Sequence, residues 1–405
     1  MENEIGIIKS LIDSDLYKLT MQQAVCKLFP RVKVKYKFIN RGKTQFPEGF
    51  AAELRKEIAK MASLTLKKEE KSFLNKRCGK FLDEVYIDFL NGYRYDPSEV
   101  GVTQKGGDLD IEFYGYWYRT ILWEVPIMSL VSELYFKMTG QEIEDFHTRT
   151  KNIQNKGQLF HQNSMKLADF GSRRRYSFDN QLEVCKTLKA MFGSEKFFVG
   201  TSNVYIAFLL DITPIGTHAH EWFMFMGAKY GFKMANEKAL EYWVDVYQGD
   251  LGIALSDTYT TNIFFKSFNK KYAKLFDGVR HDSGDPFKFI DKTVAHYISL
   301  GINPADKTIV FSNALDKDLS LEIAHYCRDK GNGIKCSFGI GTNLTNDVGV
   351  KPLNIVIKMV SAEIDGEWVE TVKLSDDEGK HTGDSETVDL ALKLLKIKNE
   401  EVISA

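Results

Sequence analysis

Four runs late in the chain decide the fold class: GIALSDTY (252–259), DGVRHDSGDP (277–286), TIVFSNALD (308–316) and KCSFGIGTN (335–343). Each is a short apolar segment that ends in small or charged residues and then opens into a helical stretch. Their spacing is close to a repeated strand-plus-helix unit, and successive units of this kind form a parallel sheet. We therefore predict an α/β fold whose parallel strands form an irregular, incomplete barrel.

Capping signals support this reading. Asp285 is a good N-cap and is followed by Pro286 at the first helical position, and Asp316 can cap the next helix. Two earlier segments, FFVGTSN (197–203) and DITPIGTHAHE (211–221), follow the same pattern. In barrels of this kind the chemistry lies on the loops after the strands, so polar residues on those loops are the candidates for function.

The two ends of the chain are different in style. Residues 32–40 (VKVKYKFIN) alternate polar and apolar, as half-buried strands do, and residues 109–125 are long, aromatic and strand-like. Residues 53–90 are charged and have apolar residues at helical spacing. Near the C-terminus, two strand-like runs flank Asp365-Gly366, which is a strong hairpin signal. We predict an N-terminal α/β domain (1–130), joined by C-terminal strands of about 353–405, and a barrel domain (131–352) with the active site.

The composition excludes several classes of protein. The 405 residues are 43% hydrophobic and carry a formal net charge of -1, which argues against a general nucleic-acid binder. The five cysteines are scattered without a C-x-x-C pair, which favours reduced thiols. The N-terminal segment is acidic and has no apolar run long enough for a signal peptide or a membrane span. We expect a cytoplasmic protein that binds no membrane.

Two clusters allow both a functional and a structural reading. In ADFGSRRRYS (168–177), three arginines can form an anion clamp, but adjacent arginines on a helix cannot all face one way, so a solvated helix start explains them as well. In GTHAHEW (216–222), a histidine before Glu221 can be a phosphate acceptor or a base. His218 and His220 can also be a metal pair, although residues two apart on a helix point to different sides. A lone histidine is more often structural than catalytic.

Two further clusters have the composition of phosphate sites. In RHDSGDP (280–286), Arg280, Asp282 and their neighbours crowd one strand end more densely than a capping loop requires. Oxygen-rich loops suit Mg²⁺ with a phosphorylated substrate, and arginine suits the phosphate itself. In FGIGTN (338–343), Gly339 and Gly341 can let backbone N–H groups approach a phosphate, although an ordinary tight turn explains them nearly as well.

Taken together, these clusters resemble the nicotinate phosphoribosyltransferases. The resemblance runs in order over nearly the whole chain, through DSDLYKLTM (13–21), DFGSRRR (169–175), GTHAHEW, LSDTYT (255–260), RHDSGDP, FSNALD (311–316) and KLSDDEGKHTG (373–383). It implies a type II phosphoribosyltransferase: an irregular α/β barrel with an N-terminal α/β layer, working as a homodimer with shared active sites. The tail departs from relatives that continue with Pro, which concerns the local loop shape and not the catalytic set.

The resemblance also implies a role for each matching residue. ATP would phosphorylate His220 to a phosphohistidine, Asp257 would position that group, and Asp282 would lie near ribose and metal. His218 occupies a variable position and is expected to be a bystander. The base would stack between Phe170 and Tyr17, the latter from the neighbouring subunit. The remaining substrate contacts would come from Arg173, Arg280, Ser312, Asn313, Gly341 and Thr342, the last four around the 5′-phosphate.

Ser202 bears on the choice of base. Relatives that use nicotinamide are similar near GTSN but carry an aspartate where Ser202 stands, and a carboxylate there would repel nicotinate. The resemblance therefore implies transfer of phosphoribose from 5-phosphoribosyl 1-diphosphate to nicotinate in NAD salvage, with Mg²⁺ as cofactor and ATP hydrolysed to ADP and phosphate. The alternatives are a nicotinamide or quinolinate phosphoribosyltransferase, or a non-catalytic sensor of pyridine nucleotides.

Overall fold

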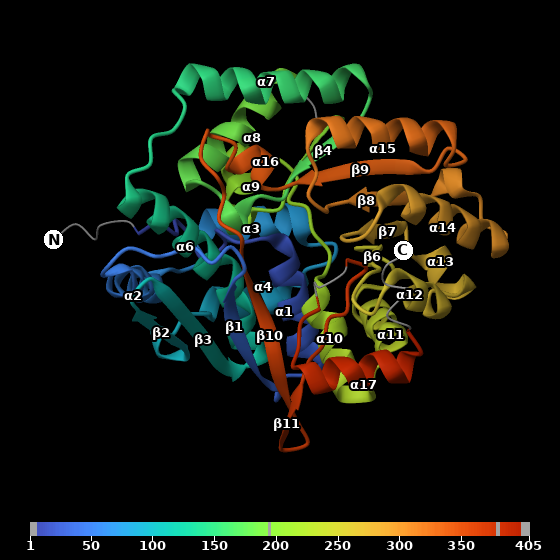
Figure 1. The fold of residues 1–405 in the computed structure, drawn as a ribbon, viewed down its shortest axis with the longest axis horizontal. Helices are drawn as coiled ribbons and strands as arrows, with labels where there is room; N and C mark the ends of the chain where they lie inside the picture. Colours follow the sequence, from blue (N-terminus) through green and yellow to red (C-terminus); the bar gives the residue numbers. More distant parts are fainter. Residues whose placement is uncertain (1–5, 193–195, 378–380, 398–405) are drawn as a thin grey trace. The chain divides into compact units, whose positions relative to one another are not determined.

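The structure, a computed structural model, describes residues 6–192, 196–377 and 381–397 (Figure 1). These residues fold into two compact units, each assembled from segments that are far apart in the sequence. Unit 1 comprises the described parts of 1–31, 35–216 and 340–358. Unit 2 comprises those of 32–34, 217–339 and 359–405. Residues 378–380, within the predicted C-terminal motif, lie outside the described residues.

Unit 2 is built on the four short parallel strands that the sequence predicts. Their order is β9-β8-β7-β6, and they span Ile253–Leu255 (β6), Gly278–His281 (β7), Thr308–Phe311 (β8) and Lys335–Ile340 (β9). Helices α14 (Pro286–Ser299) and α15 (Lys317–Asp329) lie along them (Figure 1). The α/β class with a parallel sheet is confirmed. Among the described residues β6 pairs with β7 alone, so the barrel is not closed.

The predicted helix starts in unit 2 are confirmed. The Asp285 carboxylate accepts hydrogen bonds from the backbone N–H groups of Phe287 and Lys288, with Pro286 at the first position of α14. The Asp316 carboxylate accepts in the same way from the first turn of α15. Each cap satisfies backbone donors that a helix leaves unpaired, so each fixes where a strand-end loop stops and the helix begins. The other helices of unit 2 are α10 (His220–Tyr230), α11 (Ala235–Tyr247), α12 (Thr261–Ser267), α13 (Lys270–Leu275) and α17 (Ser385–Leu395).

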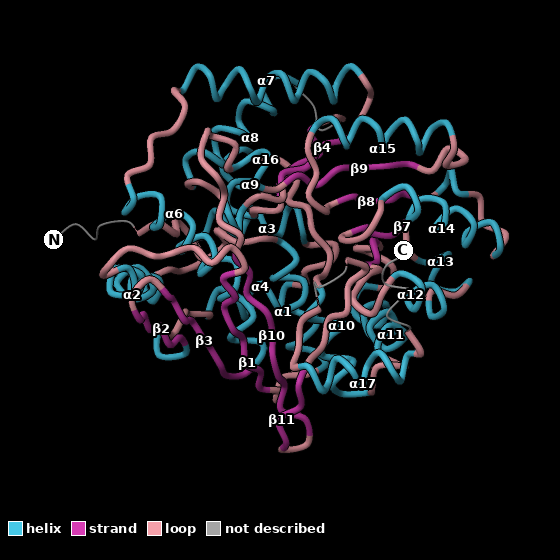
Figure 2. The backbone as a smooth tube through the Cα atoms, in the orientation of Figure 1, coloured by secondary structure: helices cyan, strands magenta, loops and turns pink. Residues whose placement is uncertain are grey.

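The C-terminal hairpin is also confirmed. Strands β10 (Ile355–Ile364) and β11 (Glu367–Glu370) pair antiparallel around Asp365 and Gly366, whose φ angles of 52° and 92° are both positive (Figure 2). Two positive φ values are what a tight two-residue hairpin turn of the mirror-image type requires. In unit 2 the start of β1 lies beside this hairpin, because Lys33 forms an ion pair of 3.1 Å with Glu363.

Unit 1 contains an antiparallel group with the order β1-β3-β2. These strands span Lys33–Asn40 (β1), Val100–Lys105 (β2) and Asp108–Tyr116 (β3). The alternation predicted for 32–40 is confirmed by the burial of Val34, Tyr36 and Phe38. The strand predicted over 109–125 is wrong beyond Tyr116, where the chain becomes helical. Trp117, Ile121 and Trp123 are fully buried. A run of apolar residues that is buried on all sides has no polar periodicity, so its sequence does not distinguish a strand from a helix.

The rest of unit 1 is mainly helical. Residues 53–90 form helices as predicted, broken into α2 (Phe50–Lys60), α3 (Lys68–Cys78) and α4 (Glu84–Gly92). A pair of parallel strands, β4 (Lys166–Asp169) and β5 (Phe198–Thr201), leads into the loops that contain Phe170 and Ser202. In the segment 211–221, where a strand opening into a helix is expected, the helix forms from His220 but the strand does not. Pro214 makes a single bridge, to Thr201, because proline lacks the N–H that a ladder needs. The other elements are α1 (Leu16–Leu28), α5 (Trp117–Thr120), α6 (Glu124–Thr139), α7 (Phe146–Gln162), α8 (Phe178–Phe192), α9 (Val204–Leu210) and α16 (Thr342–Thr345).

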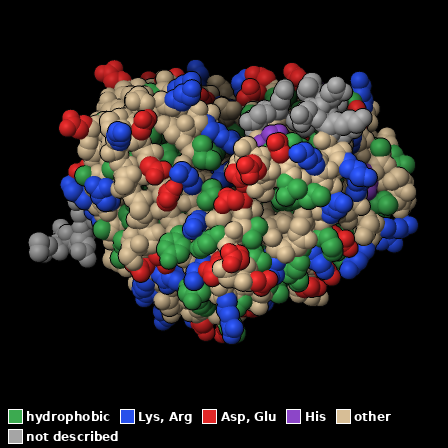
Figure 3. Space-filling view, turned by 60° about the horizontal axis from the view of Figure 1, so that its bottom comes forward, with side chains coloured by type: hydrophobic (Ala, Val, Ile, Leu, Met, Phe, Trp, Pro, Cys, Tyr) green, Lys and Arg blue, Asp and Glu red, His purple; other side chains and the backbone are tan. Residues whose placement is uncertain are grey.

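The surface agrees with the near-zero net charge of the sequence. On the face drawn in Figure 3, acidic and basic side chains are interspersed among apolar ones. No helix in the described ranges is long and apolar enough to cross a membrane.

Candidate active site

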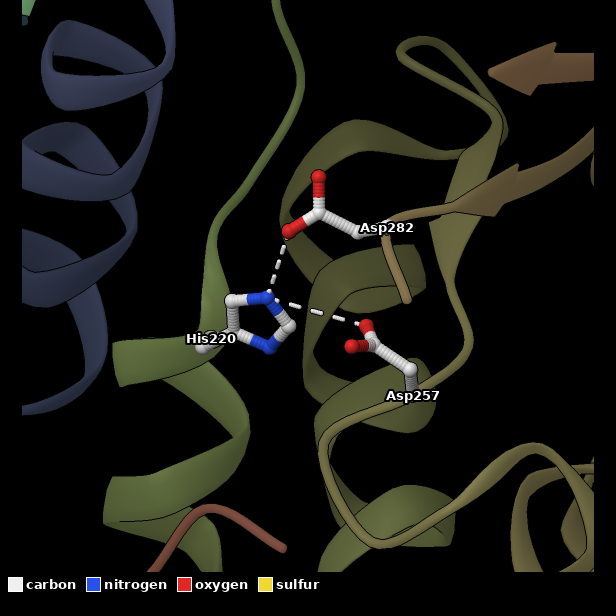
Figure 4. Close-up of side chains that lie close together, drawn as sticks. All are labelled: His220, Asp257 and Asp282. Atoms are coloured by element: carbon white, nitrogen blue, oxygen red, sulfur yellow. Dashed lines mark hydrogen bonds and ion pairs between the residues drawn. The ribbon is translucent and has the colours of Figure 1, made fainter. Parts of the chain in front are cut away.

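His220 is the first residue of α10 and lies almost fully buried in unit 2, with 8% of its side chain exposed. The Nδ1 atom lies 3.0 Å from Thr258 Oγ1. The Nε2 atom lies 2.9 Å from Asp282 Oδ2 and 3.6 Å from Asp257 Oδ1 (Figure 4). Both ring nitrogens therefore have a polar partner, and both carboxylates are on the Nε2 side.

The two carboxylates come from neighbouring strand ends. Asp257 follows β6 and Asp282 follows β7, and parallel strands place their carboxyl ends at one edge of a sheet. The pairing of β6 with β7 therefore explains why residues 25 positions apart converge on one imidazole. As the sequence predicts, a polar cluster forms at the strand ends; we call His220, Asp257, Asp282, Arg280 and Lys373 the His220 cluster.

Arg280 and Ser312 both donate to Oδ1 of Asp282, the carboxylate oxygen that does not face His220. Arg280 Nη2 lies 3.1 Å and Ser312 Oγ 2.6 Å from Asp282 Oδ1, and Arg280 Nε donates to Ser312 Oγ at 2.9 Å. Ser312 follows β8, so the loops after three successive strands meet here. Asn313, the next residue, is partly exposed.

Lys373 is the member of the cluster that sequence reasoning missed. Its Nζ lies 3.1 Å from His220 Nε2 and 3.1 Å from Asp257 Oδ2, and only 11% of the side chain is exposed. The lysine stands at the start of KLSDDEGKHTG, a segment to which only the family resemblance draws attention. The expectation that functional residues follow parallel strands does not reveal this lysine, because Lys373 follows the antiparallel β11.

The electrostatics of the cluster favour a neutral imidazole between charged neighbours. Burial lowers the pKa of His220 to about 4, and it also lowers the pKa of His218, to about 3. Burial raises the pKa of Asp282, but Arg280 and the other neighbours outweigh burial and hold that pKa well below its usual value. For Asp257 the effects of His220 and Lys373 likewise exceed that of burial and lower the pKa. At neutral pH two carboxylates thus balance two cations around an uncharged ring.

A divalent cation fits this cluster poorly as it stands. One ligand atom each from His220, Asp257 and Asp282 lies within 4.8 Å of the others, which is close enough for a shared ion. However, the Lys373 ammonium already contacts His220 and Asp257, and Mg²⁺ prefers oxygen ligands to an imidazole nitrogen. The Lys373 side chain therefore occupies the place next to His220 and Asp257 that a metal ion would need, and the ligand set does not suit Mg²⁺.

His218 lies in unit 2 but serves packing. Its Nε2 accepts a hydrogen bond of 3.1 Å from the backbone N–H of Leu255, and its ring packs edge-on against Trp243. It is 1% exposed, its ring contacts Phe223 and Trp243, and its Nε2 is already bonded to the backbone, so it does not form a metal pair with His220.

The other predicted residues lie in unit 1, where three loops converge. The backbone N–H of Leu16 donates to Ser202 O at 2.8 Å, and that of Ser202 donates to Asp169 O at 2.8 Å. The backbone N–H of Phe170 donates to Ile340 O at 2.9 Å, next to Gly341 and Thr342. Tyr17, Phe170, Ser202 and Gly341 are thus on segments that are hydrogen-bonded to one another.

The three arginines of DFGSRRR separate instead of forming one clamp. Arg173 is 40% exposed and lies 3.7 Å from Glu124. Arg174 is partly buried, and burial lowers its pKa to about 10. Arg175 is fully buried and forms a two-pronged ion pair with Asp13, at 2.7 and 3.0 Å. The multidentate anion clamp is therefore wrong for Arg175, because the short 3-10 turn Ser172–Arg174 points successive side chains in different directions.

Ser202 has a carboxylate neighbour that the sequence did not reveal. Its Oγ donates to Asp15 Oδ1 at 2.6 Å, and both residues are buried. Burial raises the pKa of Asp15, against the opposing effect of Arg173. A carboxylate is thus already present beside position 202, and Arg173 supplies positive charge near it.

At the carboxyl ends of parallel strands, Asp257, Arg280 and Asp282 meet a buried neutral imidazole from α10 and a lysine from the C-terminal segment, an arrangement typical of an α/β enzyme site. Two family models match the chain: the nicotinate phosphoribosyltransferase (NAPRTase) family over residues 165–399, and the N-terminal domain of that family over residues 12–132. A nicotinate phosphoribosyltransferase of Chromohalobacter salexigens is 51% identical over 397 residues, which cover 96% of this chain and 99% of the relative.

Further relatives agree. A nicotinate phosphoribosyltransferase of Desulforapulum autotrophicum is 50% identical over 393 residues, covering 96% of this chain and 99% of the relative. The crystal structure of nicotinate phosphoribosyltransferase from Porphyromonas gingivalis superposes with a TM-score of 0.92 at 46% identity, covering 96% and 99% of the two chains. The chain belongs to the nicotinate phosphoribosyltransferase family.

Proposed function

We propose that this protein transfers phosphoribose from 5-phosphoribosyl 1-diphosphate to nicotinate in NAD salvage, and that ATP drives the transfer through a phosphohistidine at His220. The membership of the family, over nearly the whole chain, supports the reaction and the base. The proposal also includes a cytoplasmic homodimer with shared active sites, as the resemblance implies.

One observation supports the ATP coupling most directly. The His220 ring is buried, its pKa is lowered to about 4 by that burial, and the Lys373 ammonium lies 3.1 Å from its Nε2. A phosphoryl acceptor must offer an unprotonated nitrogen at neutral pH, and cations nearby must compensate the incoming negative charge. The His220 cluster offers an unprotonated ring and the Lys373 ammonium beside its Nε2, with two carboxylates on the same side of the ring.

The roles proposed for the base lie with unit 1. Phe170 and Tyr17 are proposed to stack on the flat ring, and aromatic contacts of about 0.5–1.5 kcal/mol each orient a ring without identifying it. Arg173, partly exposed, is proposed to pair with the nicotinate carboxylate. Gly341 and Thr342, beside Phe170, are proposed to bind phosphate through backbone N–H groups.

The chemistry at ribose C1′ requires little proton transfer. The pyridine nitrogen is already a nucleophile, and diphosphate leaves with the electron pair of the C1′–O bond. The protein therefore has to hold the base in line with the C1′–O bond and to stabilise charge on the leaving group. Arg280 is the proposed cation for the leaving group, and Ser312 and Asn313 are proposed to bind the 5′-phosphate. Mg²⁺ enters this proposal only as the counterion of the substrate phosphates.

A turnover assay tests the proposal. Purified protein receives nicotinate and phosphoribosyl diphosphate, with and without [γ-³²P]ATP, and mononucleotide, phosphate and diphosphate are followed separately. We expect ATP to increase product formation and to leave a phosphoenzyme that His220→Ala does not form. Unchanged coupling of ATP hydrolysis to product in His220→Ala would falsify the role of His220.

The same assay separates the alternatives. Nicotinamide and quinolinate, each in place of nicotinate, should give little product. A preference for either base contradicts nicotinate as the substrate. Tight binding of nucleotide without release of diphosphate would indicate a sensor.

A further inference from the structure

Lys373 is anchored by its backbone on two sides. Its N–H and C=O pair with Thr382, at 2.8 Å in each direction, and the N–H of Leu374 donates to Thr258 O at 2.8 Å. Thr258 is the residue whose hydroxyl meets His220 Nδ1. The backbone thus holds the lysine in a fixed relation to the histidine, and its nearly buried side chain reaches the ring.

Two groups compete for His220 Nε2. An ammonium has three donors and no acceptor, so Lys373 can bond to Nε2 only through the nitrogen lone pair. The carboxylate of Asp282, 2.9 Å away, can bond to Nε2 only if that nitrogen carries a proton. One neutral ring cannot satisfy both, so the relative strength of these two neighbours sets the tautomer.

Thr258 can serve either tautomer, because a hydroxyl both donates and accepts. With the proton on Nδ1, the ring donates to Thr258 Oγ1 and Nε2 keeps its lone pair toward Lys373. In that state Asp282 keeps the bonds that its Oδ1 accepts from Arg280 and Ser312, and its Oδ2, which faces Nε2, has to turn away from the lone pair of the ring. Asp257 also secures the lysine, because its Oδ2 accepts from Lys373 and from Ser283.

We propose that Lys373 is a positioning residue for phosphoryl transfer, which keeps the Nε2 lone pair of His220 available and then pairs with the transferred phosphoryl group. This inference rests on the ATP coupling proposed above. A bond forms between Nε2 and the γ-phosphorus of ATP as the bond from that phosphorus to the β,γ-bridging oxygen breaks. The electron pair leaves with ADP, and the ring proton stays on Nδ1, bonded to Thr258.

The comparison of Lys373→Met with Lys307→Met tests this role. Lys307 is also a largely buried lysine of unit 2, but it stands just before β8, at the opposite end of the strand from Ser312, and donates to Phe276 O. We expect Lys373→Met to slow phosphoenzyme formation from ATP by about a hundredfold, as the loss of one well-placed donor does in other active sites. Lys307→Met should form phosphoenzyme at the wild-type rate.

A second readout does not depend on ATP. In ¹⁵N spectra of the imidazole, the wild-type ring should carry its proton on Nδ1. In Lys373→Met only the carboxylates remain at Nε2, so the proton should move there. Ethylammonium added to Lys373→Ala should restore both the tautomer and the phosphoenzyme, which it would not do for a merely structural lysine.

The outcomes are distinguishable. A wild-type protein that forms no phosphoenzyme contradicts the ATP coupling of the proposed function. A wild-type protein that forms phosphoenzyme, together with a Lys373→Met protein of unchanged rate or unchanged tautomer, overturns the role of Lys373.

Discussion

Each unit of the chain buries a cluster of charges, and the carboxylates of the two clusters are satisfied to different degrees. In unit 1, Asp13 accepts two bonds from Arg175 and one from Asn203, and Asp169 accepts from Gly171, Gln181 and Thr201. In unit 2, Asp257 Oδ1 is buried and has no hydrogen-bond donor among the described residues, and two groups compete for one nitrogen of His220. We call the first set the Asp13 cluster.

The difference separates structure from chemistry. Both partners of the Asp13–Arg175 pair are fully buried, so the pair holds the N-terminal segment against the loop after β4 and offers no atom to a substrate. In the His220 cluster the side chains keep between 1% and 20% exposure, and a new charge can rearrange the bonds. Perturbed groups with incompletely satisfied partners are typical of functional sites.

The largest effect on stability is expected from a substitution that breaks the Asp13 cluster. Arg175→Met should lower the free energy of unfolding by about 3–5 kcal/mol, because it leaves the Asp13 carboxylate buried without its counterion. Arg173→Met, in the same loop, should lower it by less than about 1 kcal/mol, since that side chain is 40% exposed. Urea unfolding of the two variants measures the difference. Equal losses would mean that the buried pair is not what holds the loop.

Two threonine substitutions, one in each cluster, should have smaller effects, one on the rate of phosphoenzyme formation and the other on stability. Thr258→Val leaves His220 Nδ1 without its hydroxyl, which should slow phosphoenzyme formation by roughly tenfold to thirtyfold, the equivalent of one hydrogen bond. Thr201→Val removes a donor to Asp169 and should lower stability by about 1–3 kcal/mol without changing that rate. Rapid-quench measurement of the phosphoenzyme and urea unfolding of both variants test the assignment. A fall in rate for Thr201→Val as large as that for Thr258→Val would contradict it.

The sequence predicted those parts of the molecule that follow local rules. The hairpin at Asp365-Gly366 and the caps Asp285 and Asp316 depend on neighbouring residues only, and all three are confirmed. The convergence of Asp257 and Asp282 follows from parallel strands, whose carboxyl ends share an edge.

The parts that were missed depend on contacts across long stretches of chain. Lys373 is 153 positions from His220, and Asp13 is 162 positions from Arg175. Neither pair lies on elements whose register a periodic pattern can supply. For Arg175 the residue type was also ambiguous, because a guanidinium suits a phosphate and a buried carboxylate equally well. Only the folded chain shows which of these partners it has.

The smallest effect concerns His218 of unit 2, a buried residue whose hydrogen bond serves the structure, as those of the Asp13 cluster do. Its Nε2 must stay unprotonated to accept from the Leu255 N–H, and burial lowers its pKa to about 3, with smaller effects from Arg280 and His220. Between the unfolded pKa of about 6.5 and that value, the unfolded chain binds a proton that the folded chain does not. Stability should therefore fall as the pH falls through this window.

His218→Gln isolates this contribution. The glutamine amide oxygen can accept from the Leu255 N–H but does not titrate, while His220 titrates in both proteins and cancels. The wild-type protein should lose roughly 1–2 kcal/mol more stability than His218→Gln between pH 6.5 and pH 5, because a full proton difference is worth about 1.4 kcal/mol per pH unit. Urea unfolding at several pH values measures this difference. Parallel stability curves for the two proteins would mean that His218 takes up a proton in the folded state, which the Leu255 hydrogen bond forbids.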